Sequence, residues 1–227
     1  MKKLLVILLC TLSLQAIKAS DFSKNTQPID GPKKRTVGIL IFYNAEVLDF
    51  AGPFEVFSVA SQMYDNTYFD VRMIAKTKDP IKAVNGLSVN PDHSFDDAPK
   101  LDILIISGGM GASLVLKDEE SMKWVKKTVK KSELTISICT GAAILAKLGF
   151  LDNKPYCTHH TIYDYVQGFA PTAKPQQDKR YVQSDEKIYT SAGISAGIDL
   201  SFHMVEILCG KEVASNTAMY MEYKGYQ

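Results

Sequence analysis

The feature that most restricts the fold of this chain is a set of short apolar runs that alternate with helical segments. Thr36–Tyr43 (TVGILIFY) is almost continuously apolar and rich in β-branched residues, which is typical of a strand buried on both faces of a parallel sheet. Leu101–Ser107 and Leu134–Ile138 have the same character, and Phe69–Ala75 predicts a further strand. Strands that alternate with helices predict an α/β sandwich with a mainly parallel sheet.

Helical segments separate these runs. Within Asp49–Met63, the side chains of Phe50, Phe54 and Phe57 share much of one face, which is typical of a helix packed on a sheet. The remaining helices are predicted over Ser121–Lys131, which is basic and carries Trp124, and over Thr140–Leu148, Ser195–Leu208 and Glu212–Tyr223.

Two hairpins complete the predicted elements. The Asn-Gly pair at 85–86 favours a two-residue turn between the segments Ile81–Val84 and Leu87–Val89. Tyr181–Gln183 and Ile188–Ser191 predict the second hairpin.

Composition excludes several classes of protein. A chain of 227 residues that is 46% hydrophobic, with 26 basic and 25 acidic residues, predicts one globular domain rather than a disordered chain. Because the charges balance, no general basic field exists and a nucleic-acid partner is not expected.

The N-terminus has the pattern of a secretory signal. Lys2 and Lys3 precede the apolar run Leu4–Leu14, and small residues follow as far as Ser20. This order predicts a signal peptide over residues 1–19, cleaved after Ala19, and therefore a secreted or periplasmic protein. The alternative is an uncleaved anchor, although the run is shorter than the roughly 20 residues that a spanning helix needs. No stable membrane insertion is expected after cleavage.

Residues 20–35 are polar and are interpreted as a tether before a domain over 36–223. Cleavage also removes Cys10 and leaves Cys139, Cys157 and Cys209. An odd number of cysteines in an exported chain indicates at least one free thiol, unless two chains are linked. The disulfide state of Cys157 and Cys209 stays open.

Cys139 stands directly after a predicted strand and before a predicted helix. Such an elbow holds a nucleophile above the sheet, and the positive helix N-terminus lowers a thiol pKa. The alternative is a buried structural cysteine, and the spacing favours neither interpretation.

Two further strand ends carry candidate groups. The glycine cluster at 108–111 follows Ser107, and its backbone N–H groups are suited to an oxyanion site or to a simple tight turn. Asp49 lies near the end of the first strand, where its carboxyl either caps the following helix or reaches the thiol; the spacing alone favours the cap.

His159 and His160 follow a predicted strand at Tyr156–Thr158. Together with Cys157 and His93 they match no reliable zinc spacing, so no metal site is expected.

Four segments together resemble the ThiJ/PfpI family, which includes the parkinsonism-associated deglycase and belongs to the class I glutamine amidotransferase-like superfamily. They are VGILIFYNAEVLDFAGPFEVF at 37–57, LDILIISGGMGA at 101–112, ISICTGAAILAKLGFLDNKPYCTHH at 136–160 and YTSAGISAGIDLSFHMVEILCG at 189–210. The resemblance covers residues 36–223 and implies a flavodoxin-like three-layer sandwich with a cysteine nucleophile elbow. LDFAGPFEVF, CTGA and TSAGISAGIDL are most similar to the isonitrile hydratase branch, and the pattern also occurs in sensor domains of AraC-type regulators.

The resemblance also implies roles for individual residues. Cys139 matches the nucleophile, and Asp49 matches its acidic partner, which reverses the interpretation from spacing. Thr140 follows the nucleophile, where protease-like members have histidine, and Gly109 matches the oxyanion glycine. His159 matches a histidine near the nucleophile whose role is less defined.

The resulting expectation is an exported family enzyme that forms a homodimer, acts on a small molecule and needs no metal or organic cofactor. Cys139 would attack a small electrophile and Asp49 would shuttle a proton, while the N–H groups of Gly109 and Thr140 hold developing charge. A thioimidate would then be hydrolysed to a formamide. The alternatives are another amidase or deglycase-like hydrolase, and a non-enzymatic ligand-binding or redox-sensing module. A regulator is disfavoured, because only Lys224–Gln227 follow the last predicted helix.

Overall fold

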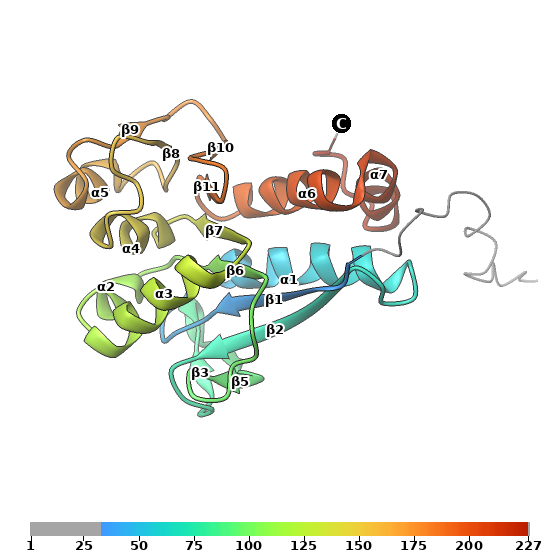
Figure 1. The fold of residues 1–227 in the computed structure, drawn as a ribbon, viewed down its shortest axis with the longest axis horizontal. Helices are drawn as coiled ribbons and strands as arrows, with labels where there is room; N and C mark the ends of the chain where they lie inside the picture. Colours follow the sequence, from blue (N-terminus) through green and yellow to red (C-terminus); the bar gives the residue numbers. More distant parts are fainter. Residues whose placement is uncertain (1–32, 227) are drawn as a thin grey trace, which may run out of the picture.

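The computed structural model describes residues 33–226, so the predicted signal peptide and most of the predicted tether lie outside the described residues. Its centre is a seven-stranded sheet in the order β10-β11-β7-β6-β1-β2-β5 (Figure 1). These strands are β1 (Arg35–Leu40), β2 (Phe69–Ala75), β5 (His93–Ser94), β6 (Ile103–Ile106), β7 (Leu134–Ile138), β10 (Tyr181–Gln183) and β11 (Ile188–Ser191).

The sheet is parallel except for the pairing of β10 with β11. Taken in chain order, its five central parallel strands follow the 2-1-3-4-5 arrangement of flavodoxin-like folds. The chain leaves β1 toward β2 on one side and returns to β6 on the other. A crevice is expected at the carboxyl ends of the strands at this reversal, and β1, β6 and β7 all end there.

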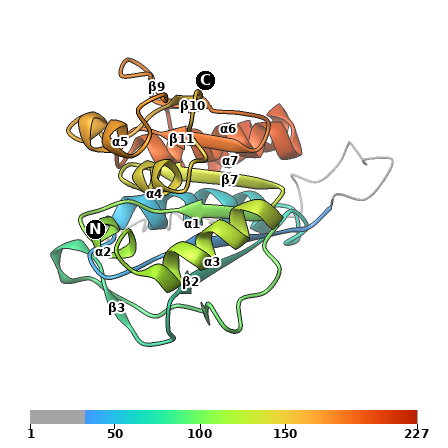
Figure 2. The same cartoon turned by 60° about the vertical axis from the view of Figure 1, so that its left-hand side comes forward.

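Helices cover both faces of the sheet (Figures 1 and 2). One layer packs around α1 (Val47–Gln62), α6 (Ala196–Cys209) and α7 (Lys211–Tyr220), which contact one another. The other layer contains α2 (Ala112–Val115), α3 (Glu119–Lys131), α4 (Gly141–Lys147) and α5 (Tyr163–Phe169).

Alternating side chains of the strands supply the two cores. In β6, Ile103 and Ile105 belong to the cluster around α1 and α6, whereas Leu104 and Ile106 belong to the cluster around α3 and α4. All four are completely buried. Since burying one such side chain stabilises a fold by roughly 1.5–3 kcal/mol, the continuously apolar strands are what hold the three layers together.

The predicted elements are found with small shifts at their ends. β2, β7, β10 and β11 have the predicted bounds, and the first helix begins two residues earlier than predicted, at Val47. The Asn-Gly hairpin joins β3 (Ile81–Lys82) and β4 (Ser88–Val89), which are shorter than predicted. The predicted two-residue turn is wrong: the connection is a 3-10 turn over the three residues Val84–Gly86, closed by the hydrogen bond from the Ala83 N–H to the Leu87 carbonyl. Its central residues, Asn85 and Gly86, have φ values of 61° and 88°.

The short elements β5, α2, α5 and β9 (Lys174–Pro175) were not predicted. The predicted strand Tyr156–Thr158 is instead β8 (Pro155–Tyr156), which pairs with β9 outside the main sheet. Over the described part of the chain, no helix has both the length and the apolar character that crossing a bilayer requires.

Candidate active site

Cys139 occupies a strained elbow between β7 and α4. Its φ of 56° is left-handed, which costs a residue other than glycine about 1–3 kcal/mol. The Cys139 N–H donates to the Ser191 carbonyl at 3.3 Å, and the Thr158 hydroxyl donates to the Cys139 carbonyl at 2.8 Å. A Cβ at Gly141 would lie 2.4 Å from the Ile106 carbonyl oxygen, so glycine lets α4 begin directly against β6. The predicted elbow is therefore present and is held from both sides.

Asp49 lies in the first turn of α1 and is completely buried. The N-cap of this helix is Glu46, so the interpretation of Asp49 as a cap is wrong. Its Oδ2 atom accepts a hydrogen bond from the Gly108 N–H at 3.0 Å, whereas Oδ1 has no hydrogen-bond partner among the described residues. The carboxyl thus faces the glycine turn after β6 rather than the N–H groups of its own helix.

The electrostatics of Asp49 and Cys139 are coupled. Burial, followed by repulsion from Glu46, raises the pKa of Asp49 to about 7, although the Gly108 N–H and the Cys139 thiol oppose the rise. Burial, followed by repulsion from the Asp49 carboxylate, raises the pKa of Cys139 to about 12. The Thr140 N–H opposes that rise but does not cancel it. Burial and the nearby carboxylate therefore outweigh the effect of the helix N-terminus, and the resting thiol is neutral at pH 7.

Gly108, Gly109 and Thr140 join the glycine turn to the elbow. The Thr140 hydroxyl accepts a hydrogen bond from the Gly109 N–H at 2.6 Å, donates to the Gly109 carbonyl at 2.9 Å and lies 4.0 Å from the Cys139 sulfur. The Gly109 N–H, predicted as an oxyanion donor, is thus bound to this hydroxyl in the resting site. Gly109 has a φ of 107°, and a Cβ there would lie 2.4 Å from the backbone nitrogen of Glu46.

Gly108 is a site residue to which sequence reasoning assigned no role. A Cβ at this position would lie 2.6 Å from the Thr140 nitrogen and 2.7 Å from Asp49 Oδ2. Only glycine therefore allows the carboxyl and the elbow to approach so closely. The Gly-Gly pair at 108–109 was visible in the sequence, but it was interpreted as an oxyanion turn. It did not indicate that Gly108 makes room for the Asp49 carboxyl beside the elbow.

His159 lies at the edge of the site and makes no hydrogen bond to Cys139 or Asp49. Its Nδ1 atom pairs with the Thr161 hydroxyl at 2.8 Å, and its ring stacks with that of His160 at 4.4 Å between centroids. Burial and the charge of His160 lower the pKa of His159. The imidazole is therefore mostly neutral at pH 7, and the charged group that interacts with the thiol is the Asp49 carboxylate rather than His159.

The loop between β11 and α6 contributes a further group that was not predicted. Ile194 has a φ of 57°, and its backbone N–H helps to hold down the pKa of Asp49. The Ile194 side chain is 37% exposed. Tyr43, before α1, and Met110, after the glycine turn, are 56% and 78% exposed. Each of the three loops around the buried pair therefore presents an apolar side chain to solvent.

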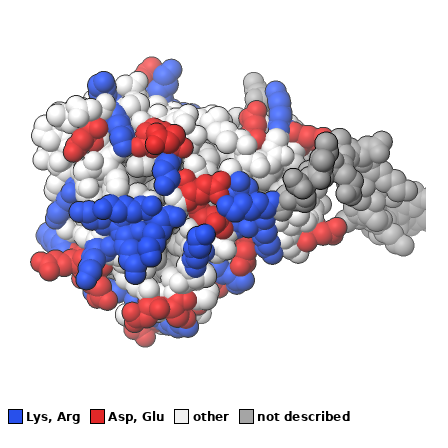
Figure 3. Space-filling view, viewed as in Figure 1, with Lys and Arg blue, Asp and Glu red and all other residues white. Residues whose placement is uncertain are grey.

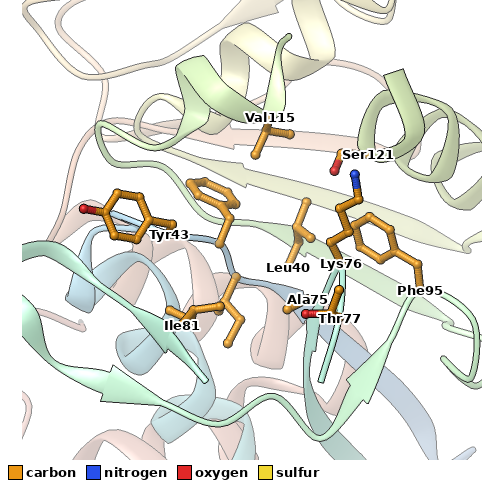
Figure 4. A pocket seen from close by; sticks show the side chains of 11 residues that line it. Leu40, Tyr43, Ala75, Lys76, Thr77, Ile81, Phe95, Val115 and Ser121 are labelled. Atoms are coloured by element: carbon orange, nitrogen blue, oxygen red, sulfur yellow. The ribbon is translucent and has the colours of Figure 1, made fainter. Parts of the chain in front are cut away.

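Within residues 33–226 no cluster of three metal-ligating side chains occurs. All three described cysteines are free, and the Cys157 thiol donates to the carbonyls of Gln176 and Lys179 at 3.3 and 3.4 Å. A cavity of about 120 Å³ lies at the ends of β1 and β2. Figure 4 shows its lining, which includes Leu40, Tyr43, Lys76 and Phe95. Neither Cys139 nor Asp49 lines it.

Comparison with known proteins places this site in a family context. Residues 35–207 match the model of the DJ-1/PfpI family. The chain is 28% identical over 187 residues to isonitrile hydratase of Pseudomonas putida, covering 82% of this chain and 78% of that enzyme. It is 29% identical over 136 residues to the glutathione-independent glyoxalase DJR-1.2 of Caenorhabditis elegans, covering 59% of this chain and 70% of that enzyme.

Other relatives are regulators. The HTH-type transcriptional regulator GbdR of Pseudomonas aeruginosa is 23% identical over 188 residues, which cover 83% of this chain and 50% of the regulator. This chain therefore spans about half the length of that relative.

Solved structures confirm the predicted fold. A ThiJ/PfpI family protein from Pseudomonas syringae matches with a TM-score of 0.77 at 24% identity, covering 92% of this chain and 86% of that one. Drosophila melanogaster DJ-1beta matches with a TM-score of 0.71 at 20% identity, covering 84% and 98%. At these identities the likeness concerns the fold alone.

Proposed function

Because the chain belongs to the DJ-1/PfpI family, we propose that it is an enzyme of the isonitrile hydratase type, in which Cys139 adds to a small electrophilic carbon. The observation that carries this proposal is the pairing of two buried groups: a thiol on a strained elbow and a carboxyl whose pKa is about 7. A pKa near the working pH is what general acid–base catalysis requires. Similarity to an isonitrile hydratase over most of the chain supports the choice of reaction.

Proton transfer begins from the neutral thiol. Asp49 carries one free carboxylate oxygen, Oδ1, and is half ionised at pH 7, so it accepts the thiol proton as the sulfur attacks. The Gly108 N–H keeps Oδ2 occupied and so fixes the orientation of the carboxyl. The same acid then donates that proton to the substrate carbon, which returns Asp49 to its ionised form.

The atoms balance without a cofactor. In the first step the S–H bond breaks, C–S and C–H bonds form at the isonitrile carbon, and a thioimidate results. In the second step water adds to that carbon and the C–S bond breaks. The proton returns to sulfur, and an N-substituted formamide leaves. Hydration of an isonitrile consumes one water molecule and involves no oxidant or reductant.

In the second step, water adds to the C=N bond of the thioimidate, and the charge that develops on the substrate nitrogen needs hydrogen-bond donors. The Thr140 N–H and hydroxyl lie beside the sulfur, and the Gly109 N–H becomes available when the hydroxyl turns toward substrate. The exposed apolar side chains of Met110 and Ile194 favour a substrate with a hydrocarbon substituent.

The alternatives place different demands on the thiol. A peroxide sensor requires a thiolate, and a pKa of about 12 leaves little thiolate at neutral pH. A glyoxalase-like or deglycase-like reaction would use the same cysteine, and one relative is a glyoxalase, so this remains the second candidate.

The test is turnover of alkyl and aryl isonitriles, with formamide measured by mass spectrometry and carbonyl adducts and peroxide assayed in parallel. Cys139→Ser should abolish turnover, because serine is a far weaker nucleophile. Asp49→Asn should lose most of it, because an amide cannot transfer the proton. Cys157→Ser is the matched control, since this buried thiol donates to the backbone carbonyls of Gln176 and Lys179, away from the elbow.

For each variant, one result would contradict the proposed mechanism. Full turnover of isonitriles by Cys139→Ser would reject the covalent mechanism, and full turnover by Asp49→Asn would reject the proton shuttle. If wild type acts on carbonyl adducts and not on isonitriles, the second candidate replaces the first.

We also propose, from the sequence pattern and the family resemblance, that the mature chain is exported and forms a homodimer.

A further inference from the structure

The exposed side of α3 concentrates positive charge. Five lysines occupy nine consecutive positions, and all five are exposed: Lys123, Lys126, Lys127, Lys130 and Lys131. At 3.6 residues per turn they fall within an arc of about 140° and extend over roughly 12 Å along the axis. Figure 3 shows the resulting concentration of blue where Figure 1 places α3. We call these five residues the lysine face.

The lysine face is not neutralised by this chain. No ion pair within residues 33–226 involves any of its five members. Of the neighbouring acids, Glu120 pairs with Lys76, and Glu133 pairs with Lys33 and Arg35. Glu119, in the first turn of α3, makes no ion pair within residues 33–226, so one acid faces five lysines. The lysine face therefore remains locally cationic in a chain whose formal charge is only +1.

Helix stability does not explain this arrangement. Lys130 and Lys131 complement the helix dipole in the last turn, but Lys123, Lys126 and Lys127 lie further back. Lys123–Lys127, Lys126–Lys130 and Lys127–Lys131 are like-charge pairs four residues apart, which destabilise a helix. An anionic partner would remove that repulsion.

From this geometry we propose that the lysine face docks the protein on an anionic phospholipid surface. The opposite face of α3, with Met122, Val125 and Val129, is committed to the core, so the helix does not insert and the attachment is electrostatic. Its one aromatic residue, Trp124, is half-buried and stacked on Phe95 at 4.3 Å, which leaves no exposed aromatic for stacking on nucleic-acid bases. A row of exposed lysines along the outer side of a helix fits a flat array of anionic headgroups.

The test compares binding of the full chain to phosphatidylcholine vesicles with and without 30% phosphatidylglycerol, by co-sedimentation. The triple variant Lys126→Gln/Lys127→Gln/Lys130→Gln removes three charges while keeping helix propensity. The matched control, Lys187→Gln/Lys211→Gln/Lys224→Gln, removes three exposed charges elsewhere. Since each lysine near an anionic surface contributes roughly fivefold in affinity, the first variant should bind about a hundredfold more weakly.

Wild type and the control should bind the anionic vesicles at low salt, release them as salt increases, and ignore the neutral vesicles. Equal binding by the two triple variants would overturn the proposal, as would no binding by wild type. Tighter binding to duplex nucleic acid than to the vesicles would also overturn it. Circular dichroism of the variants checks that α3 is intact.

Discussion

Replacement of Asp49 by asparagine should change how the stability of this fold depends on pH. The folded-state pKa of about 7 lies above the ordinary value of 3.8, because the carboxyl is buried. The folded protein therefore binds this proton more tightly than the unfolded chain does. The resulting contribution to stability is complete below pH 3.8, declines as pH rises, and is lost once the pH passes 7.

The magnitude follows from the two pKa values. Their separation of about three pH units corresponds to about 4 kcal/mol over the whole titration, since each unit is worth 1.36 kcal/mol. Between pH 5 and pH 8 the loss is about 2.5 kcal/mol, because part of the titration is already complete at pH 5. Asparagine does not ionise, so the Asp49→Asn variant avoids this loss and should gain stability relative to wild type as pH rises.

The assay is urea unfolding at several pH values between 5 and 8, followed by circular dichroism. The free-energy difference between Asp49→Asn and wild type should grow by about 2.5 kcal/mol from pH 5 to pH 8. Asp152→Asn, which changes an exposed carboxyl, should run parallel to wild type. Titrating histidines contribute equally to both proteins and cancel in the difference. Parallel curves for Asp49→Asn and wild type would refute the argument that burial holds this carboxyl near neutrality.

The remaining predictions concern the elbow and the two proposals on assembly and export. Thr158→Val should lower the free energy of unfolding by about 1–3 kcal/mol and slow turnover, because the Cys139 carbonyl loses its buried hydrogen-bond donor. Thr158→Ser keeps the hydroxyl and should restore both. Equal turnover rates in the two variants would argue against a role of this hydroxyl in holding the elbow. Gly108→Ala should abolish turnover in the isonitrile assay, because its Cβ would displace the Asp49 carboxyl. Iodoacetamide should label Cys139 faster in Asp49→Asn at pH 8, because the repulsion that raises the thiol pKa is gone. Intact mass of native material should begin near Ser20, and light scattering should give twice the mass of one chain.

Fold and family could be predicted because the apolar patterns are local. Continuous β-branched runs identified the buried strands, and the two strands that meet the elbow, β7 and β11, were predicted with their observed bounds. The family assignment from four ordered segments is confirmed by the match over residues 35–207. The short elements β5, α2, α5 and β9 escaped prediction because two to seven residues are too few to establish a period.

The position of Asp49 shows where local rules fail. An acidic residue just before an apolar helical pattern has the signature of an N-cap, and that signature placed the helix start two residues too late. Counting back in fours from buried Phe57 passes through Pro53 to Asp49, so the carboxyl shares the buried face of α1. A buried carboxyl on that face needs a partner, and the helix itself offers none.

The pKa of the Cys139 thiol is a second property that local sequence rules alone could not predict. Sequence identified the helix N-terminus next to Cys139, which lowers a thiol pKa, and this local effect is present through the Thr140 N–H. Spacing alone could not identify the burial of the sulfur. Only the family resemblance pointed to the Asp49 carboxylate, which the first strand–helix connection brings to the sulfur from 90 positions earlier in the chain. Those two effects dominate and reverse the sign of the shift. In the mechanism proposed above, a neutral thiol beside a half-ionised carboxyl stays unreactive until substrate binds, because attack and proton transfer then occur together.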